Sequence, residues 1–180
     1  MENNNPQQKP DMKKIMINMG LLLGVISILI SVVNYTLGDN IFQPHWSLQL
    51  LGFIISIVVI VYGMKQYKES NQGFLKLGEA IKIGLGISVI SGLLGVVYFI
   101  IFTNFIEPTF FEQYIDFQRE AAIEGNPDLS VEQIDAGLKM SKPFMNAGFF
   151  AAIQIILALF FGFIISLISG LVLKRENPAA

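Results

Sequence analysis

The sequence predicts an all-α protein: an integral membrane four-helix bundle with a small extracytoplasmic helical hairpin between the third and fourth spans. Three observations lead to this fold class. The 180 residues are 53% hydrophobic and only 14% charged, which is too apolar for an ordinary soluble domain. The stretch from Ile83 to Ile106 contains no charged residue. Three further apolar runs are long enough to cross a bilayer.

The first span follows a polar tail. Residues 1–12 are rich in Asn and Gln, a composition that cannot bury a core, so we expect a disordered cytoplasmic tail. The membrane domain is predicted over residues 13–175, and its first apolar run covers residues 15–37. This run exceeds the apolar core of a signal peptide, about 7–15 residues, so we predict an uncleaved span.

The second and third spans are separated by a short basic connection. The second is predicted over residues 48–64, near the lower limit of about 17 residues for a crossing helix. Lys65 and Lys68 follow it, and Asn, Gln and Gly at positions 71–73 mark a turn. The third span is then predicted over residues 81–106.

The segment from residue 107 to residue 143 is acidic, with eight Asp and Glu against three Lys and Arg. Within it Phe110, Tyr114 and Phe117 recur at helical spacing, with acidic residues on the opposite side. A second helix is predicted after Ser130, which opens a capping-box sequence. We therefore expect a helical hairpin whose docking face is formed by the three aromatic residues.

The fourth span is predicted over residues 144–173, followed by Lys174, Arg175 and a cytoplasmic tail, residues 176–180. At about 1.5 Å per residue it exceeds a hydrocarbon core of about 30 Å, so we expect it to tilt or protrude. Nine of the twelve Lys and Arg lie on the side of the two termini. The positive-inside rule therefore places both termini in the cytoplasm and the acidic hairpin outside.

Small residues recur at four-residue spacing in every predicted span. Such faces let helix backbones approach closely in lipid, where no hydrophobic force drives helices together. We expect them to pack within one bundle; the alternative is that the small face of the fourth span drives homodimerisation. The positions on the third and fourth spans are Gly84, Ser88, Gly92, Ala158, Gly162, Ser166 and Gly170.

Lys82 is the one charged residue within the apolar run of a predicted span, and Glu79 precedes it by three positions. Residues at this spacing meet on one helix face and can form an ion pair. Because Lys82 lies about one turn inside the cytoplasmic end, its side chain can extend to the interface. We predict an interfacial anchor, with a role in ion or substrate passage as the alternative.

Catalytic, cofactor-binding and metal sites are not predicted. The chain has no Cys, which excludes thiolate ligands and nucleophiles, and the single histidine, His45, cannot build a zinc site of the usual ligand set. The middles of the spans hold no Asp, Glu, His or Arg, which counts against a proton-coupled carrier. We expect a protein that is not an enzyme, needs no cofactor and binds no nucleic acid, since no basic patch faces outward.

Three segments carry a family resemblance: GFLKLGEAIKIG at residues 73–84, FIEPTFFEQ at residues 105–113 and KPFM at residues 142–145. With the four spans and the acidic segment, they make the chain, from about Lys13 to Arg175, similar to the uncharacterised proteins of domain-of-unknown-function family 4199. The resemblance implies a four-span protein of a bacterial inner membrane, found largely in Bacteroidetes. It implies no functional residues, because the motifs are structural.

Two functions remain open on the sequence. The first, which we favour, is a non-enzymatic interaction or assembly protein. Its aromatic face, Phe110, Tyr114 and Phe117, would dock on the membrane surface, on the bundle or on a partner. The second is a small transporter or channel subunit that acts as an oligomer around a path lined by Ser, Gly and Asn. The expected partners are the lipid bilayer and either a second copy or another membrane protein.

Overall fold

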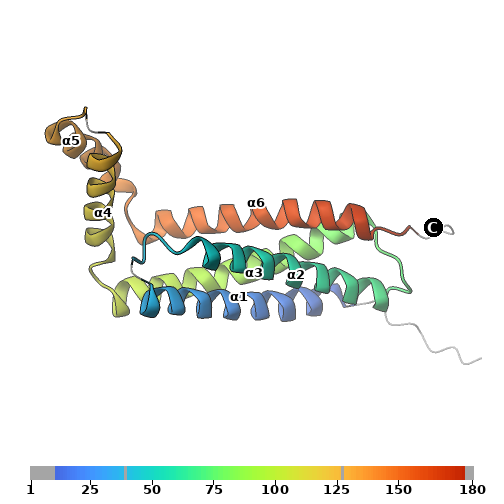
Figure 1. Ribbon diagram of the computed structural model, residues 1–180. Helices are drawn as coiled ribbons and strands as arrows, with labels where there is room; N and C mark the ends of the chain where they lie inside the picture. Colours follow the sequence, from blue (N-terminus) through green and yellow to red (C-terminus); the bar gives the residue numbers. More distant parts are fainter. Residues whose placement is uncertain (1–10, 39, 127, 177–180) are drawn as a thin grey trace, which may run out of the picture.

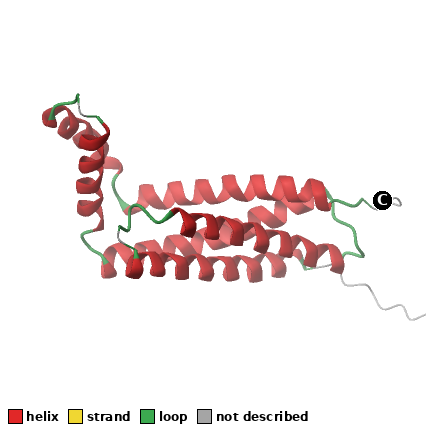
Figure 2. Ribbon diagram, viewed as in Figure 1, coloured by secondary structure: helices red, strands yellow, loops and turns green. Residues whose placement is uncertain are grey.

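The computed structural model describes residues 11–38, 40–126 and 128–176. Four long helices lie side by side in a bundle, and two shorter helices stand across one end of it (Figure 1; Figure 2). The described residues contain no strand. The predicted all-α bundle with a hairpin between its third and fourth long helices is confirmed. The predicted tails lie outside the described residues up to position 10 and from position 177.

The elements are α1 (Met12–Leu37), α2 (Trp46–Ser70), α3 (Leu77–Ile101), the π-helical turn η1 (Phe102–Ile106), α4 (Phe110–Gly125), α5 (Val131–Ser141), the 3-10 turn η2 (Lys142–Phe144) and α6 (Ala147–Leu173).

Three of the long helices begin or end outside the predicted apolar spans, and the fourth is shorter than predicted. α1 begins at Met12, before residue 15, whereas α6 begins at Ala147, after the predicted start at residue 144, which lies in the 3-10 turn. α2 continues past Met64 to Ser70, and α3 begins at Leu77. Lysines after the apolar run do not end α2, because lysine is a good helix former. The helix ends where Gln72 and Gly73 take positive φ angles of 58° and 82°, a left-handed conformation that a helix does not continue through.

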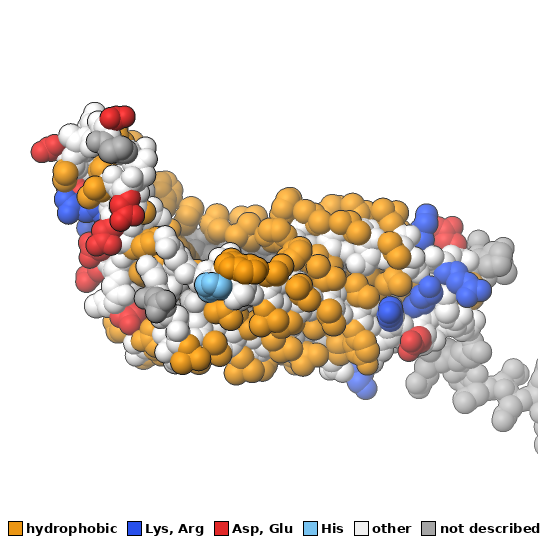
Figure 3. All heavy atoms as spheres, viewed as in Figure 1, with side chains coloured by type: hydrophobic (Ala, Val, Ile, Leu, Met, Phe, Trp, Pro, Cys, Tyr) orange, Lys and Arg blue, Asp and Glu red, His pale blue; other side chains and the backbone are white. Residues whose placement is uncertain are grey.

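The surface of the bundle is apolar. Each of the four long helices is long and apolar enough to cross a membrane. Large apolar side chains cover their outer surface (Figure 3); Leu29, Val58 and Ile168 are 59%, 59% and 60% exposed. An exposed apolar belt of this extent indicates a multi-pass membrane protein.

Charged residues gather at the two ends of the bundle (Figure 3). Lys and Arg predominate at the end that holds the start of α1 and the end of α6, here called the terminal end. Asp and Glu predominate on α4 and α5 at the opposite end, here called the hairpin end.

The main hydrophobic core lies toward the terminal end. There Ile60, Met64, Leu75 and Ile83 are at most 1% exposed. α3 forms the centre of the bundle, because it packs extensively against both α1 and α6, whereas α2 packs less closely against each of its neighbours.

α3 and α6 pack through small residues in antiparallel register. Added Cβ atoms on the glycines would lie at most 3.3 Å from the opposite side chain, so only residues of this size allow the contact. The small face of the fourth span is therefore buried inside the bundle and is not free to form the homodimer considered from the sequence. The pairs of this α3–α6 seam are Ala80 with Gly170, Gly84 with Ser166, Ser88 with Gly162 and Gly92 with Ala158.

Candidate functional site

At the terminal end, hydrogen bonds connect α2 and the segment between α2 and α3 to the end of α6. Leu75 and Arg175 exchange two backbone hydrogen bonds of 2.9 Å. The Nζ of Lys68 donates to the carbonyl oxygen of Leu173 at 2.8 Å. These bonds tie the connection between α2 and α3 to the end of α6.

Glu79 also forms hydrogen bonds at the terminal end, but its partner is not Lys82. Its Oε1 accepts from the Tyr67 hydroxyl at 3.0 Å, and its Oε2 accepts from the backbone N–H of Lys76 at 2.8 Å. The predicted ion pair between Glu79 and Lys82 is not formed. The one salt bridge among the described residues joins Arg119 of α4 to Asp135 of α5. Lys82 is exposed, and an interfacial anchor stays a prediction for it.

The predicted docking face of the hairpin covers the protein's own bundle. The rings of Phe110, Tyr114 and Phe117 surround Phe42, in the connection between α1 and α2, with ring centroids 5.3, 5.5 and 5.4 Å away. From the other side, Phe150 of α6 meets the Tyr114 ring edge-on at 5.2 Å. Such aromatic pairs contribute about 0.5–1.5 kcal/mol each beyond the area they bury. The sequence left three surfaces open for this face: the membrane surface, the bundle or a partner. In the structure the face packs against the bundle.

A hydrogen-bonded carboxylate joins the hairpin to α1. The Oε2 of Glu107 accepts from the Tyr35 hydroxyl at 3.2 Å. Its Oε1 accepts from the Thr109 hydroxyl at 2.6 Å and from the Gln113 amide at 2.9 Å. We call these four residues the Glu107 hub. The hub ties the point at which the chain leaves α3 for α4 to the last turns of α1.

The hub lowers the pKa of Glu107. The largest cause is the hydrogen bond from the Thr109 hydroxyl, which favours the charged carboxylate. Partial burial opposes this effect, and the bonds from Tyr35 and Gln113 add to it. The carboxylate is therefore ionised at neutral pH, with both oxygens engaged by neutral donors.

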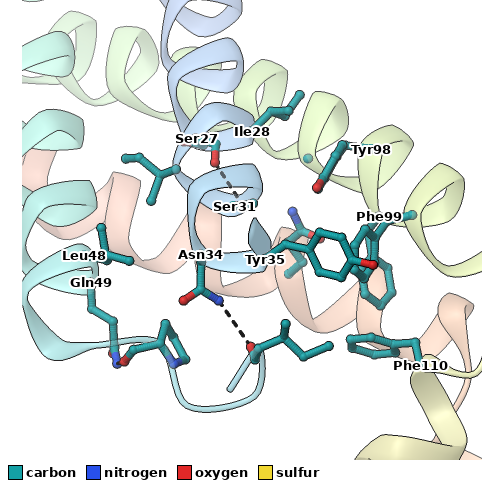
Figure 4. Close-up of a pocket in the computed structure, with 16 residues that line it drawn as sticks. Ser27, Ile28, Ser31, Asn34, Tyr35, Leu48, Gln49, Tyr98, Phe99 and Phe110 are labelled. Carbon is teal, nitrogen blue, oxygen red and sulfur yellow. Dashed lines mark hydrogen bonds between the residues drawn. The ribbon is translucent and has the colours of Figure 1, made fainter. Parts of the chain in front are cut away.

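A cavity of about 400 Å³ lies at the hairpin end, between α1, α2, α3 and α6 and beside the start of α4 (Figure 4). This volume is within the range of about 300–1,000 Å³ that is usual for ligand pockets. We call it the hairpin-end cavity. No Asp, Glu, Lys, Arg or His is among its lining residues, so its walls carry no formal charge.

Aromatic rings and amides line different sides of this cavity. Figure 4 shows Tyr98, Phe99 and Phe110 on one side, and Asn34 and Gln49 on the other. The rings provide an apolar wall, whereas the amides provide hydrogen-bond donors and acceptors. The cavity is therefore amphipathic and neutral.

Asn34 has an unsatisfied oxygen. Its Nδ2 donates to the carbonyl oxygen of Ile41 at 3.4 Å. Its Oδ1 is the one buried side-chain polar atom without a hydrogen-bond partner in the described ranges. In Figure 4 this oxygen is turned away from Ile41, to the side of Leu48 and Gln49. An unpaired buried acceptor costs about 1–3 kcal/mol, and this oxygen is enclosed by protein atoms and does not face the open part of the cavity.

Gln154 of α6 brings a third amide to the cavity. A Cβ on Gly95 would collide with its Nε2, so the glycine leaves the room that this side chain occupies. No group of three His, Cys, Asp or Glu in the described part of the chain is placed to hold a metal ion. The arrangement is suited to binding a neutral molecule.

Comparison with known proteins identifies the family. The family model described as "Protein of unknown function (DUF4199)" matches residues 18–175. The chain belongs to this family. The resemblance predicted from the sequence is thereby confirmed, and the matched stretch contains the α3–α6 seam, the Glu107 hub and all residues that line the hairpin-end cavity. No curated protein and no solved structure matches the chain.

The three segments that carried the resemblance to the DUF4199 family have structural roles in this member. Residues 73–84 fasten the terminal end and enter the α3–α6 seam. Residues 105–113 contain three of the four residues of the Glu107 hub. Residues 142–145 form the 3-10 turn η2 and the start of the connection into α6.

The hairpin-end cavity was not predicted from the sequence. On α1, Gly20, Gly24, Ser27, Ser31 and Tyr35 follow one helix face at spacings of three and four. The two glycines pack against α3, whereas the two serines and the tyrosine line the cavity. The change from glycine to hydroxyl-bearing side chains along one face is the signal that could have located it.

Proposed function

We propose that the protein is a non-enzymatic binding protein of the bacterial inner membrane, which holds a small neutral amphipathic molecule in the hairpin-end cavity. The observation that carries the proposal is one cavity with an aromatic wall and three uncharged amide side chains, Asn34, Gln49 and Gln154. Ligand pockets combine mainly apolar walls with a few polar groups that fix orientation. The lining has no apparent pair of nucleophile and base, which favours binding over catalysis.

The charge distribution supports an orientation. Because Lys and Arg predominate at the terminal end, the positive-inside rule places both termini in the cytoplasm and the hairpin outside. Since the chain has no Cys, Gly137→Cys on α5 and Gly78→Cys at the terminal end can each carry a single label. Neither glycine has a neighbour within 4 Å of an added Cβ. A membrane-impermeant thiol reagent applied to spheroplasts should label the first variant only; the opposite pattern would reverse the orientation.

The interaction role favoured from the sequence receives less support. Phe42 and Phe150 already cover the aromatic face that was expected to dock on a partner. A partner would have to displace these rings before it could reach Phe110 or Tyr114.

Filling the cavity tests the proposed binding. Ser31→Phe places a ring at the cavity wall, whereas Val32→Phe, at the next position of α1, replaces a side chain that is 39% exposed on the apolar surface. With para-hexylphenol as the probe, the unmodified protein and V32F in lipid nanodiscs should gain about 2.7 kcal/mol of stability at roughly 100 times the Kd. S31F should gain none. Equal stabilisation of all three proteins would show that the probe acts outside the cavity.

A small transporter that acts as an oligomer is the second candidate. It is favoured by one observation: the cavity lies at the hairpin end, while the terminal half is tightly packed. Alternating access needs a site that is closed toward one side of the membrane. Probe flux into proteoliposomes that is lost in S31F would support the transporter, whereas binding without flux would support the binding protein.

A further inference from the structure

We infer that the hairpin-end cavity binds an uncharged molecule through a carbonyl oxygen, which accepts hydrogen bonds from the amide of Gln154 and the hydroxyl of Tyr98. This inference rests on the proposed function, because it names the chemical class of the molecule that the cavity would hold. Its starting point is that both side chains line the cavity, while neither forms a hydrogen bond with another described residue.

Gln154 is a polar residue deep within an apolar helix. It lies about two turns after the start of α6 at Ala147, between Ile153 and Ile155. A polar side chain in a membrane span ordinarily forms a hydrogen bond with a neighbouring helix. The amide of Gln154 forms no such bond within the described ranges. Because an unpaired polar group in a membrane interior is strongly disfavoured, this amide favours a partner from outside the chain.

The amide of Gln154 and the hydroxyl of Tyr98 lie at the same wall of the cavity. A Cβ on Gly95 would collide with the Nε2 of Gln154, so the amide lies directly over this glycine of α3. Tyr98 follows Gly95 by three positions and is therefore on the same face of α3, one turn nearer the hairpin. In Figure 4 its hydroxyl points to the side of the Tyr35 ring. One ligand atom between α3 and α6 therefore has both groups near it.

Both groups are accessible. The one enclosed side-chain polar atom without a partner in the described part of the chain is the Oδ1 of Asn34, so the unpaired groups of Gln154 and Tyr98 are not sealed off by protein. On the opposite side of the cavity, Asn34 and Gln49 each donate to a backbone carbonyl oxygen, at 3.4 and 2.9 Å. The polar groups left for a ligand are therefore concentrated at the wall formed by α3 and α6.

Donors outnumber acceptors at this wall. A glutamine amide has two N–H donors and one carbonyl oxygen, and the tyrosine hydroxyl adds a further donor. A ligand hydroxyl would bring one more donor to the surplus. A carbonyl oxygen brings none, and its two lone pairs can accept from the amide and the hydroxyl together. The balance of donors and acceptors therefore favours a carbonyl group.

A carboxylate would also accept these bonds, but it would lack a counterion. No Lys, Arg or His is among the lining residues. Tyr35, which lines the cavity, donates to the negatively charged Glu107 at 3.2 Å, so an anion would meet a like charge nearby. An unpaired ion in an apolar environment is strongly disfavoured. The class is therefore a neutral ketone, ester or amide.

A second hollow adjoins the cavity on the surface of the bundle. It has a volume of about 290 Å³ and shares Phe99 and Gln154 with the cavity. Among its other lining residues, Ile153 and Leu157 are 41% and 48% exposed on the apolar surface. The Gln154 amide therefore lies between the cavity and a hollow that faces lipid, which suits a ligand with an apolar ring or chain beside its carbonyl group.

Two probes that differ only in the acceptor test this inference on the full chain. They are para-hexylacetophenone and para-hexyl-α-methylstyrene, in which a CH2 group replaces the carbonyl oxygen. Nanodiscs of ether-linked phosphatidylcholine supply a bilayer whose lipids have no carbonyl group. Thermal stabilisation at rising probe concentration gives each affinity, relative to the probe content of empty nanodiscs. We expect the ketone to bind about tenfold more tightly than the alkene, the difference expected for one hydrogen bond.

Variants assign the preference to the two donors. Gln154→Leu should abolish it, and Tyr98→Phe, which keeps the ring, should reduce it. Gln66→Leu and Tyr62→Phe change exposed residues of α2 and should keep it in full. Infrared spectroscopy gives a direct signature, because the carbonyl stretching band of the bound ketone should lie at lower frequency in the unmodified protein than in Gln154→Leu.

The outcomes separate the inference from the proposed function. Equal affinity of the unmodified protein for the ketone and the alkene would overturn the inference, with water as the partner of Gln154, while the cavity would still be a binding site. A full preference in Gln154→Leu would also overturn it. If neither probe binds and para-hexylphenol does not bind either, both proposals fail. If Gln154→Leu does not fold, the unmodified protein and Tyr98→Phe decide the question.

The lipid composition of the nanodiscs identifies the source of the carbonyl group. If ester-linked phosphatidylcholine, in place of part of the ether-linked lipid, weakens the apparent affinity for the ketone, the carbonyl group belongs to a lipid ester. If the affinity is unchanged and the ketone is still preferred over the alkene, the ligand is a free small molecule. Both results agree with the inference, whereas loss of the preference in every lipid mixture contradicts it.

Discussion

In the half of the bundle nearer the terminal end, Gly20 and Gly24 of α1 lie against side chains of α3. Farther along the same face of α1, Ser27 and Ser31 line a cavity instead. The same helices are thus packed into a solid core at one end, and at the other they surround a partly open space that Phe110, at the start of the hairpin, helps to line.

The difference shows what holds helices together in this fold. Lipid is as apolar as a helix surface, so helices approach closely only where small residues allow backbone contact. The α3–α6 seam supplies such residues from Ala80 to Gly92 on α3. Beyond Gly92, the larger Tyr98, Phe99 and Phe102 line the cavity. The close packing of the half nearer the terminal end holds the bundle together, and the half nearer the hairpin end contains the cavity.

Filling the α3–α6 seam should have the largest effect. Gly84→Leu drives a side chain into Ser166, and we expect it to lower the free energy of unfolding by about 3 kcal/mol, the upper end of the usual range for overpacking. Gly78→Leu, on the same helix with nothing within 4 Å of an added Cβ, is the matched control. Thermal melting in nanodiscs measures both, and equal stability of the two variants would show that the seam is not tightly packed.

Loosening the hairpin end should have a smaller effect. Phe42→Ala removes the ring that contacts three aromatic residues of α4, and we expect a loss of about 2 kcal/mol. Hydrogen exchange should show weaker protection in α4 and unchanged protection in α3. Phe105→Ala, at a side chain that is 80% exposed, should change neither helix. Equal loss of protection in α3 and α4 would mean that the two halves unfold together.

Acidification should have the smallest effect. Because the hub lowers the pKa of Glu107, its contribution to stability is complete above the ordinary glutamate pKa of 4.5 and is lost as the pH falls through the lower pKa of the folded state. The melting temperature should therefore fall on acidification by more in the unmodified protein than in Glu107→Gln. Glu112→Gln, at an exposed position of α4, should keep the full pH dependence. If Glu107→Gln kept it too, another carboxyl group would be responsible.

Much of the fold follows from local sequence. Apolar runs and their flanking charges located the four long helices, and the capping box at Ser130 and Gln133 forms as predicted, with bonds of 2.9 and 3.3 Å. The extension of α2 to Ser70 was missed, because the end of an apolar run marks a membrane boundary and not a helix end. The partner of Glu79 was missed, because helical spacing to Lys82 does not reveal that Tyr67 of another helix competes for the carboxylate.

The cavity depends on information that no single helix contains. The cavity is a place where neighbouring helices do not pack against each other. The residue pattern of a single helix shows which of its faces could make contacts, but not where contacts between helices are missing. Asn34 and Gln154 were recognisable as polar residues within apolar spans, but their grouping with the aromatic residues of α3 needs the bundle in three dimensions.

The paired backbone bonds between Leu75 and Arg175 bear on the order of assembly. Leu75 is 0% exposed in the finished fold, and its amide and carbonyl groups are satisfied by a residue that follows the last long helix. During membrane insertion α1, α2 and α3 are present before α6, so during that interval the α2–α3 connection is unfastened and the small face of α3 is uncovered. We therefore expect insertion of α6 both to cover the small face of α3 and to supply the backbone partner of Leu75.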